Sequence, residues 1–254
     1  MKLKTLFFLL FLSKFVAGQN QKDFLYVFDK DWKPVEVKKA IYLIHVQQVS
    51  DSCWQWDYYN LYGPMIKTEH YKDKDGEILH GEVNYYSNGK LDSGGTYING
   101  KKDGDFWKFT DSFRVKYKYV YSNDSLIETI DVTKKDKQKA IEDSIKRAKQ
   151  RELDSVEIES VYPGGDRGWG RYLKDNLKYP DRAVNGNFQG DVVIRFIIDK
   201  EGNLTNSQII QSVEYSLDTE AMRIIKGSGK WVPAVQFGRK VKSYKQQPIA
   251  FRLR

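Results

Sequence analysis

Cysteine is almost absent from this sequence, because Cys53 is the only one among 254 residues. A single cysteine cannot form an intramolecular disulfide, so the fold has to be stabilised by packing and by hydrogen bonds. Cys53 lies in the segment "DSCWQWDYY", beside Trp54 and Trp56. We interpret it as a small apolar core residue, with a reactive thiol as the alternative.

Histidine is also scarce. His45, His70 and His80 are the only three, and their spacings match no metal-ligand template. A nucleophilic site would need Cys53 next to one of them in space, which the sequence does not indicate. We therefore expect no catalytic residue, no metal site and no cofactor. The chain is expected to be neither an enzyme nor a protein that binds a small-molecule substrate.

Long hydrophobic runs are absent beyond the first 18 residues. The opening "MKLKTLFFLLFLSKFVAGQ" has Lys2 and Lys4 before an apolar run and small residues after it, which is typical of a signal peptide. A membrane-spanning helix needs ~20 apolar residues, whereas this run is shorter and contains Lys14. We predict a signal peptide over residues 1–18, cleaved after Gly18, and export of the chain. An uncleaved inner-membrane anchor is the alternative.

Acidic residues are in deficit, since 42 Lys and Arg face 34 Asp and Glu and leave a net charge of +8. The predicted signal peptide holds three lysines and no acid, so its removal lowers the net charge to +5. A basic chain often binds nucleic acid, but an exported protein meets little of it. We expect no nucleic-acid partner and interpret the basic surface as solvated and facing anionic lipid or a polymer.

Aromatic residues are abundant from Asp23 to about Thr129, where Asn-Gly and Asp-Gly pairs recur. Asn88-Gly89 and Asn99-Gly100 lie eleven residues apart, each shortly after an aromatic residue and just before a lysine. Both central positions of a type I′ turn need a positive φ, which Asn-Gly adopts at low cost. The pattern predicts an antiparallel β-meander over residues 23–129, with aromatic side chains packed on their cross-strand neighbours.

The segments "YYSNGK" and "YINGKKDGDFW" resemble the MORN-type repeat of many bacterial envelope proteins. The resemblance covers about thirty-five residues and implies a scaffold or a contact surface, without a chemical reaction. A plain β-meander that binds no partner is the alternative.

Residues 130–156 are predicted to form a charged helical linker. In "TKKDKQKAIEDSIKRAKQREL" the apolar residues recur at helical spacing but form only a thin stripe. We expect a solvated connecting helix about 30 Å long. A helix on a membrane surface is the alternative, although Glu142 and Asp143 interrupt its basic face.

Residues 157–254 show the order helix, hairpin, helix, strand. Trp169, Tyr172, Leu173 and Leu177 mark one face of a first helix that Pro180 is expected to end. In "DVVIRFIID" the residues Val192, Ile194, Phe196 and Ile198 alternate as one buried face of a strand. The turn "DKEGN" then leads back into "LTNSQIIQS", which completes a predicted hairpin.

A second helix is predicted from Ser216, a candidate N-cap, to Gly227, with a buried stripe that includes Leu217 and Ile224. The last strand, "SYKQQPIAFRLR", contains Pro248, which indicates an edge strand or a bulge because proline has no N–H. The fold class predicted for this region is α+β, with two helices on one face of an antiparallel sheet.

These motifs resemble the C-terminal domain of TonB, the energy transducer of outer-membrane transport. The resemblance is carried over about ninety residues by "YPDRA", "QGDVVIRFIIDKEGNLTN", "SLDTEAMRIIKGSGKWVPA" and "PIAFRL", which occur in the family's order. The segment "YPGGDRGWGRYLKDNLKYP" is most similar to the Bacteroidetes branch of the family.

The resemblance implies that the domain binds the TonB box, a short extended segment of TonB-dependent outer-membrane receptors, by adding it as a strand to its sheet. The pairing edge would then run from Ser243 to Leu253, with Tyr179 and Pro180 framing a nearby loop. The alternative for this pair is a helix stop packed on the core, and Trp231 and Pro233 are expected to be core and turn residues. The expected partner-binding residues are Tyr179, Pro180, Ser243, Tyr244, Lys245, Gln246, Gln247, Ile249 and Phe251.

The sequence also departs from the family pattern. A working TonB has an inner-membrane anchor that meets a proton-driven motor and a long proline-rich linker, whereas here six prolines are scattered. We therefore expect a periplasmic protein that binds outer-membrane receptors, with inner-membrane motor subunits as possible partners if the anchor is retained. The second hypothesis is an envelope scaffold that binds proteins through its β-meander and transduces no energy.

Overall fold

The computed structural model describes residues 23–110, 113–133, 158–236 and 238–253. The chain folds as two compact units. An N-terminal unit comprises Met1–Asn88 and Asp92–Ile130, and a C-terminal unit comprises Gly89–Leu91 and Asp131–Arg254. The predicted signal peptide and almost all of the predicted charged helix lie outside the described residues.

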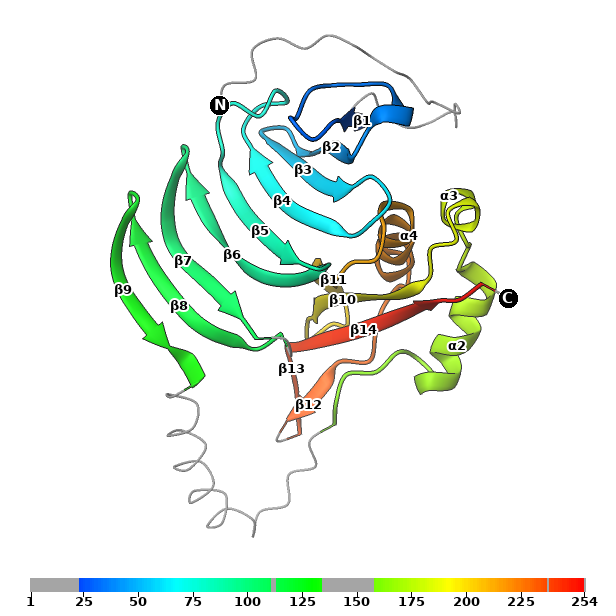
Figure 1. The fold of residues 1–254 in the computed structure, drawn as a ribbon. Helices are drawn as coiled ribbons and strands as arrows, with labels where there is room; N and C mark the ends of the chain where they lie inside the picture. Colours follow the sequence, from blue (N-terminus) through cyan, green and yellow to red (C-terminus); the bar gives the residue numbers. More distant parts are fainter. Residues whose placement is uncertain (1–22, 111–112, 134–157, 237, 254) are drawn as a thin grey trace. The chain divides into compact units, whose positions relative to one another are not determined.

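The N-terminal unit is an antiparallel β-meander, as predicted, in which each strand pairs with the next along the chain (Figure 1). A short 3-10 helix, η1 (Val37–Lys39), follows the first strand. The strands are β1 (Asp23–Phe28), β2 (Tyr42–Ser50), β3 (Cys53–Asn60), β4 (Met65–Tyr71), β5 (Gly81–Ser87), β6 (Lys90–Ile98), β7 (Lys101–Phe109), β8 (Val115–Ser122) and β9 (Ser125–Asp131).

The two Asn-Gly pairs form the turns that the sequence predicts. Asn88 and Gly89 join β5 to β6 with φ of 49° and 76°, and Asn99 and Gly100 join β6 to β7 with φ of 51° and 81°. Positive φ at both positions is the signature of a type I′ turn. The Asp103-Gly104 pair, by contrast, lies inside β7.

The core of the N-terminal unit is largely aromatic. The rings of Trp32 and Tyr42 stack with centroids 4.4 Å apart, and the edge of Trp32 meets Tyr58 at 5.9 Å. Cys53 is only half-buried, so its predicted place in the core is wrong. It is the first residue of β3, next to the turn, and lies outside the cluster formed by Phe28, Ile44, Val46 and Tyr58.

Buried polar side chains cross this sheet in a row. His45, Asp57, Thr68 and Asn84 lie opposite one another on β2, β3, β4 and β5 and are all at most 8% exposed. His45 hydrogen-bonds Asp23 and lies 3.7 Å from a carboxylate oxygen of Asp57. Burial alone would lower the pKa of His45, but the two carboxylates outweigh it and raise this pKa to about 9.

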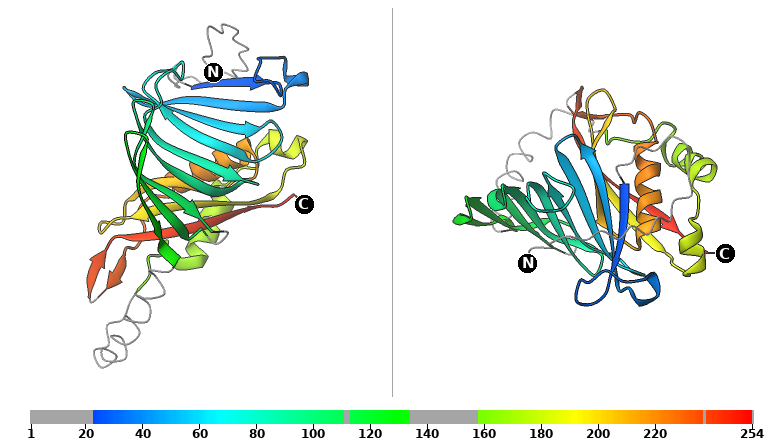
Figure 2. Two further views of the ribbon diagram at one scale, coloured as in Figure 1. Left: turned by 60° about the vertical axis from the view of Figure 1, so that its left-hand side comes forward. Right: turned by 90° about the horizontal axis from the view of Figure 1, so that it is seen from above.

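The C-terminal unit is an α+β layer. Its main sheet has the order β11-β10-β14, all antiparallel, and helix α4 packs on β10 and β11 (Figures 1 and 2). The predicted hairpin is confirmed, and Val192, Ile194, Phe196 and Ile198 are fully buried. The strands are β10 (Gly190–Ile198), β11 (Leu204–Gln211), β12 (Ala234–Gln236), β13 (Arg239–Val241) and β14 (Ser243–Phe251).

The described part of this unit has three helices where two were predicted. Helix α2 (Gly165–Asn176) ends well before Pro180, so the predicted helix stop at that proline is wrong. Pro180 is instead the N-cap of a short helix α3 (Asp181–Asn185). Beyond the C-cap Leu177, the Glu220 carboxylate accepts the backbone N–H of Lys178 at 2.7 Å, which stabilises that residue outside the helix.

Helix α4 (Tyr215–Lys226) begins one residue after Glu214, so Ser216 is not the N-cap. The Glu214 carboxylate accepts the Ser216 N–H at 2.8 Å and its hydroxyl at 2.6 Å. A buried carboxylate thus takes the role that sequence patterns assign to serine. Gly227 ends the helix as predicted, and Leu217 and Ile224 are fully buried.

The turn between β10 and β11 depends on Gly202. The Asp199 carboxylate accepts the N–H groups of Glu201 and Asn203 at 2.9 and 2.8 Å, which closes the turn. Gly202 has a φ of 87°, and a Cβ there would lie 2.2 Å from the carbonyl oxygen of Trp231. Trp231 is 4% exposed, which confirms its predicted core position.

Replacing Gly202 by alanine should therefore destabilise the chain strongly. A left-handed alanine costs about 1–2 kcal/mol, and the overlap with Trp231 should raise the loss to at least about 3 kcal/mol. The matched control is Gly229→Ala, because Gly229 has a φ of 74° and open space around its Cβ position. Urea unfolding measures the free energy of unfolding of both variants. An equal loss of stability in the two would show that the contact with Trp231 does not matter.

The His45 network predicts a pH-dependent stability. Because the folded pKa of about 9 exceeds the ordinary 6.5, the stabilisation is complete below about pH 6.5 and is lost as pH rises through 9. With Asp23 59% exposed, screening should limit the effect to about 1–2 kcal/mol. Urea unfolding of the wild type and of His45→Gln should differ by this amount at about pH 6 and converge near about pH 9.5. A pH-independent difference would contradict the ion pair.

Candidate functional site

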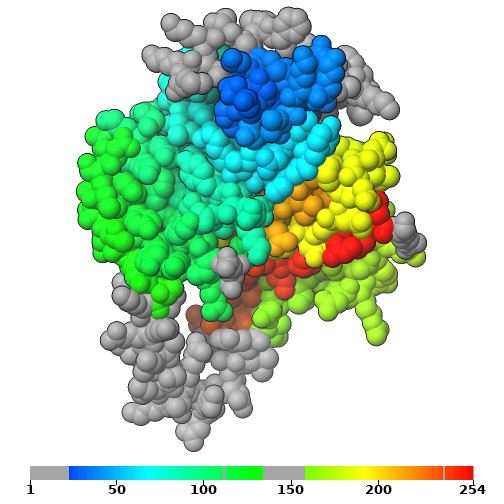
Figure 3. Space-filling model, viewed as in Figure 1, coloured from blue at the N-terminus to red at the C-terminus, as the bar shows by residue number. Residues whose placement is uncertain are grey.

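Strand β14 is the candidate site, and its register with β10 is unbroken. Ser243 lies opposite Ile198 and Phe251 opposite Gly190, with no bulge between them. Among the residues that the structure describes, β14 pairs with β10 only, so its other edge is open. Figure 3 shows β14 as a red band at the surface of the unit. The predicted edge position of Pro248 is confirmed.

Side chains along β14 alternate between the core and solvent. Ile249 and Phe251 are at most 1% exposed, so their side chains belong to the core and are closed to a partner. Ser243, Lys245 and Gln247 share that face and are partly buried. The solvent face carries Tyr244, Gln246, Pro248 and Ala250, with Tyr244 73% exposed.

The direction of the backbone groups follows from a side chain of the neighbouring strand. Gln211 on β11 donates its amide to the carbonyl of Asp191 at 3.0 Å, so this carbonyl of β10 points away from β14. Asp191 lies opposite Ala250. In an antiparallel pair, both residues direct their N–H and C=O groups either toward each other or apart. Ala250 therefore directs its groups toward the open edge.

The same orientation recurs at every second residue, so Pro248, Gln246 and Tyr244 also face the open edge with their backbone groups. Pro248 fits this assignment, because its missing N–H removes no hydrogen bond of the β10–β14 ladder at a position that faces the open edge. Its carbonyl is within 3.3 Å of the Gln247 side-chain amide, away from the β10 ladder. The edge thus offers three N–H donors and four carbonyl acceptors.

Tyr179 packs on the C-terminal end of β14, and Pro180 follows it as the N-cap of α3. The Tyr179 hydroxyl donates to the carbonyl of Phe188 at 2.5 Å, and its ring meets Phe251 edge-on at 5.7 Å. Burial raises the pKa of Tyr179, and Arg252 lowers it in part. Pro180 accepts the first backbone N–H groups of α3, from Ala183 and Val184. The geometry gives this pair a structural role beside the edge.

Two residues that sequence reasoning missed, Gln189 and Asp191, hold the C-terminal end of β14. Arg252 pairs with the Asp191 carboxylate at 2.7 Å, and the N–H of Leu253 donates to the side chain of Gln189 at 3.0 Å. Only the position of Asp191 at the start of a predicted strand could have indicated this contact. The clamp fixes β14 against β10 just beyond its last core residue.

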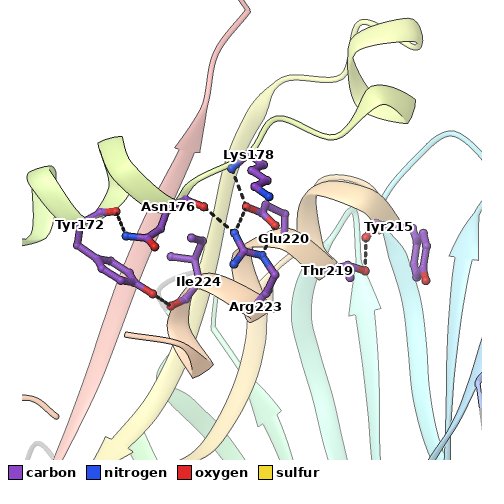
Figure 4. A network of polar contacts seen from close by, with 8 residues as sticks. All are labelled: Tyr172, Asn176, Lys178, Tyr215, Thr219, Glu220, Arg223 and Ile224. Carbon is purple, nitrogen blue, oxygen red and sulfur yellow. Dashed lines mark hydrogen bonds and ion pairs between the residues drawn. The ribbon is translucent and has the colours of Figure 1, made fainter. Parts of the chain in front are cut away.

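The segment that leads to Tyr179 is held by a polar network on α4 (Figure 4). Arg223 donates to the Glu220 carboxylate at 2.7 Å and to the carbonyl of Asn176 at 2.7 Å. The Tyr172 hydroxyl donates to the carbonyl of Ile224 at 3.0 Å, which ties α2 to α4. The loop beneath the edge is therefore positioned before any ligand arrives.

The chemistry that this edge offers is main-chain hydrogen bonding. The titratable groups of β14 are Tyr244 and Lys245, and the Arg252–Asp191 pair lies at its C-terminal end. The hydroxyl oxygen of Ser243 is shielded and has no hydrogen-bond partner among the described residues. Of the nine residues predicted to bind, Tyr244 and Gln246 have outward side chains and outward backbone groups; Pro248 and Ala250 share this geometry and were omitted.

Comparison with known families gives one match. Residues 175–253 match the model described as the Gram-negative bacterial TonB protein C-terminal domain. No curated protein and no solved structure matches the chain. Members of this family interact with outer-membrane receptors, belong to the cell envelope and are not enzymes. The match covers less than a third of the chain and lies within the C-terminal unit, from the end of α2 through β14, where it supports the TonB C-terminal family.

Proposed function

We propose that the C-terminal unit binds the TonB box of an outer-membrane receptor as an additional strand on the open edge of β14, and thereby supports energy-coupled transport. The observation that carries the proposal is the set of outward backbone groups at Tyr244, Gln246, Pro248 and Ala250. An extended peptide satisfies such groups regardless of most of its side chains, which suits a domain that serves receptors of different sequence.

The rigid setting of β14 favours this mode. Its inner face is anchored by buried Ile249 and Phe251, and its end is clamped by Arg252. A strand that is already ordered loses little conformational entropy when a ligand is added. The domain therefore contributes a preformed template, and the ordering cost falls on the receptor segment.

The setting of the domain in the cell is part of the proposal. Cleavage of the predicted signal peptide would leave the mature chain in the periplasm, and an uncleaved N-terminal segment would instead anchor it in the inner membrane. In the described ranges no helix is long and apolar enough to cross a membrane. Contact with inner-membrane motor subunits distinguishes a true energy transducer from a soluble adaptor, and cross-linked capture from the envelope detects it.

The backbone assignment predicts that Gln246→Pro weakens receptor binding. This change removes one outward N–H without touching the β10–β14 ladder. Loss of one hydrogen bond of about 1–1.5 kcal/mol should raise the Kd roughly tenfold. Fluorescence anisotropy with a labelled TonB-box peptide measures the Kd, and urea unfolding should show stability changed by less than about 1 kcal/mol.

Two matched variants test the assignment. Gln246→Ala removes the side chain and keeps the N–H, so the Kd should stay within about twofold. Gln247→Pro removes an N–H that faces β10 and should destabilise the domain by about 2–4 kcal/mol. Equal affinity of Gln246→Pro and the wild type would show that the peptide does not use this edge. Deletion of Ser243–Arg254 is unsuitable, because it also removes the core residues Ile249 and Phe251.

A second function, an envelope scaffold of the MORN type, is favoured by strand β9. Leu126 and Ile127 on it are 53% and 65% exposed, and within the described ranges β9 pairs with β8 only. An exposed apolar edge strand is a template for pairing with another chain. The meander would then hold a protein partner independently of β14.

The scaffold predicts that Leu126→Lys combined with Ile127→Lys abolishes capture of a partner from the envelope. Two charges on the strand oppose the approach of another apolar edge. The comparison is Gln246→Pro, which should leave such a partner bound. Quantitative mass spectrometry of the captured proteins distinguishes the two functions. The scaffold is excluded if Gln246→Pro loses every captured partner and the β9 variant loses none.

A further inference from the structure

The last part of the chain has an unusual charge distribution. No aspartate or glutamate occurs after Glu220, whereas nine lysines and arginines do. Two of these cations are neutralised by carboxylates, Arg223 by Glu220 and Arg252 by Asp191. Within the described residues, Arg239, Lys240, Lys242 and Lys245 have no such carboxylate partner. Lys226 and Lys230 have none either, so four of the six described cations without a carboxylate partner lie just before or at the start of β14.

The same region contains a small ladder of backbone pairs. Residues 158–161 run antiparallel to residues 232–235, with Ile158 opposite Val235 and Val161 opposite Val232. Backbone hydrogen bonds of 2.9 to 3.1 Å join both pairs in both directions. Strand β12 then pairs with β13, which places Lys240 opposite Val235. Ile158, Val235 and Lys240 thus form one cross-strand row. We name these segments, with Lys242, the basic ladder; it contains one exposed acid, Glu159, and three exposed cations, Arg239, Lys240 and Lys242.

Aliphatic side chains on the basic ladder are open to solvent. Ile158 is 49%, Val161 38% and Val232 43% exposed, and Arg239, Lys240 and Lys242 are exposed as well. Single exposed aliphatic residues are common on proteins, but here three gather in one ladder that continues into unpaired cations. Figure 2 shows β12 and β13 at the start of β14, at the opposite end of that strand from the C-terminus.

We propose that the basic ladder is a docking surface for an anionic phospholipid membrane. Cations beside anionic headgroups and aliphatic side chains at the acyl boundary are the two contributions that hold proteins at such an interface. The described exposed residues of the ladder include no aromatic ring on which a nucleic-acid base could stack. The charge fits a surface of many phosphates, and the aliphatic residues fit its hydrocarbon boundary.

The test is co-sedimentation of the chain from Gln19 onward with lipid vesicles, so that the apolar N-terminal segment does not contribute. Vesicles with about one third phosphatidylglycerol should bind the protein at low salt, and pure phosphatidylcholine should not. Lys240→Glu with Lys242→Glu changes the local charge by four and should weaken binding by roughly six hundredfold, at roughly fivefold per charge. Ile158→Ser with Val232→Ser should weaken it by about tenfold without a change of charge.

The matched control is Arg171→Glu with Lys174→Glu, which makes the same change of charge at exposed positions of α2, outside the ladder. It should retain vesicle binding within about fivefold, and circular dichroism checks that each variant is folded. Equal loss in the control and in the ladder variant would overturn the proposal, because binding would then depend on net charge alone. Tight binding of poly-glutamate that Ile158→Ser with Val232→Ser leaves unchanged would also overturn it in favour of an acidic peptide.

Discussion

The C-terminal unit depends on the central position of β10 between two antiparallel neighbours. One face of this strand, through Val192, Ile194, Phe196 and Ile198, forms the floor on which α4 packs. At ~25 cal/mol per Å² of apolar area, four such side chains contribute several kcal/mol. The hydrogen-bond ladder between β10 and β14 then fixes which side chains of β14 face the core. It also fixes which of its backbone groups pair with β10 and which face the open edge.

Buried acids complete this arrangement by shaping the chain around the sheet. Glu214 caps α4 and pairs with Arg182, while Glu220 holds both Lys178 and Arg223. A buried carboxylate is stable only when several donors surround it. Each acid therefore joins two parts of the chain: Glu214 joins the start of α4 to Arg182 of α3, and Glu220 joins α4 to the segment that follows α2.

Much of this fold could be predicted from the sequence, and the failures have a common cause. Asn-Gly turns, the alternation in β10 and the edge position of Pro248 depend on neighbours along the chain and were predictable. The contact of Glu220 with Lys178 and the cap at Glu214 involve carboxylates that are distant in sequence or atypical for their role, and sequence reasoning missed both. At the candidate site the strand was found, but the assignment of outward residues needed the Gln211–Asp191 contact from another strand.

Pro248 gives the open edge of β14 a distinct position. A row of identical donors and acceptors would let an added strand slide by two residues with no loss of hydrogen bonds, so its register would be degenerate. The missing N–H at Pro248 breaks that translational symmetry, because one acceptor of the added strand finds no donor there. The favoured registers of the added strand are those in which the carbonyl opposite Pro248 can do without a hydrogen bond from β14. Pro248 therefore gives an otherwise uniform edge a preferred register for an added strand.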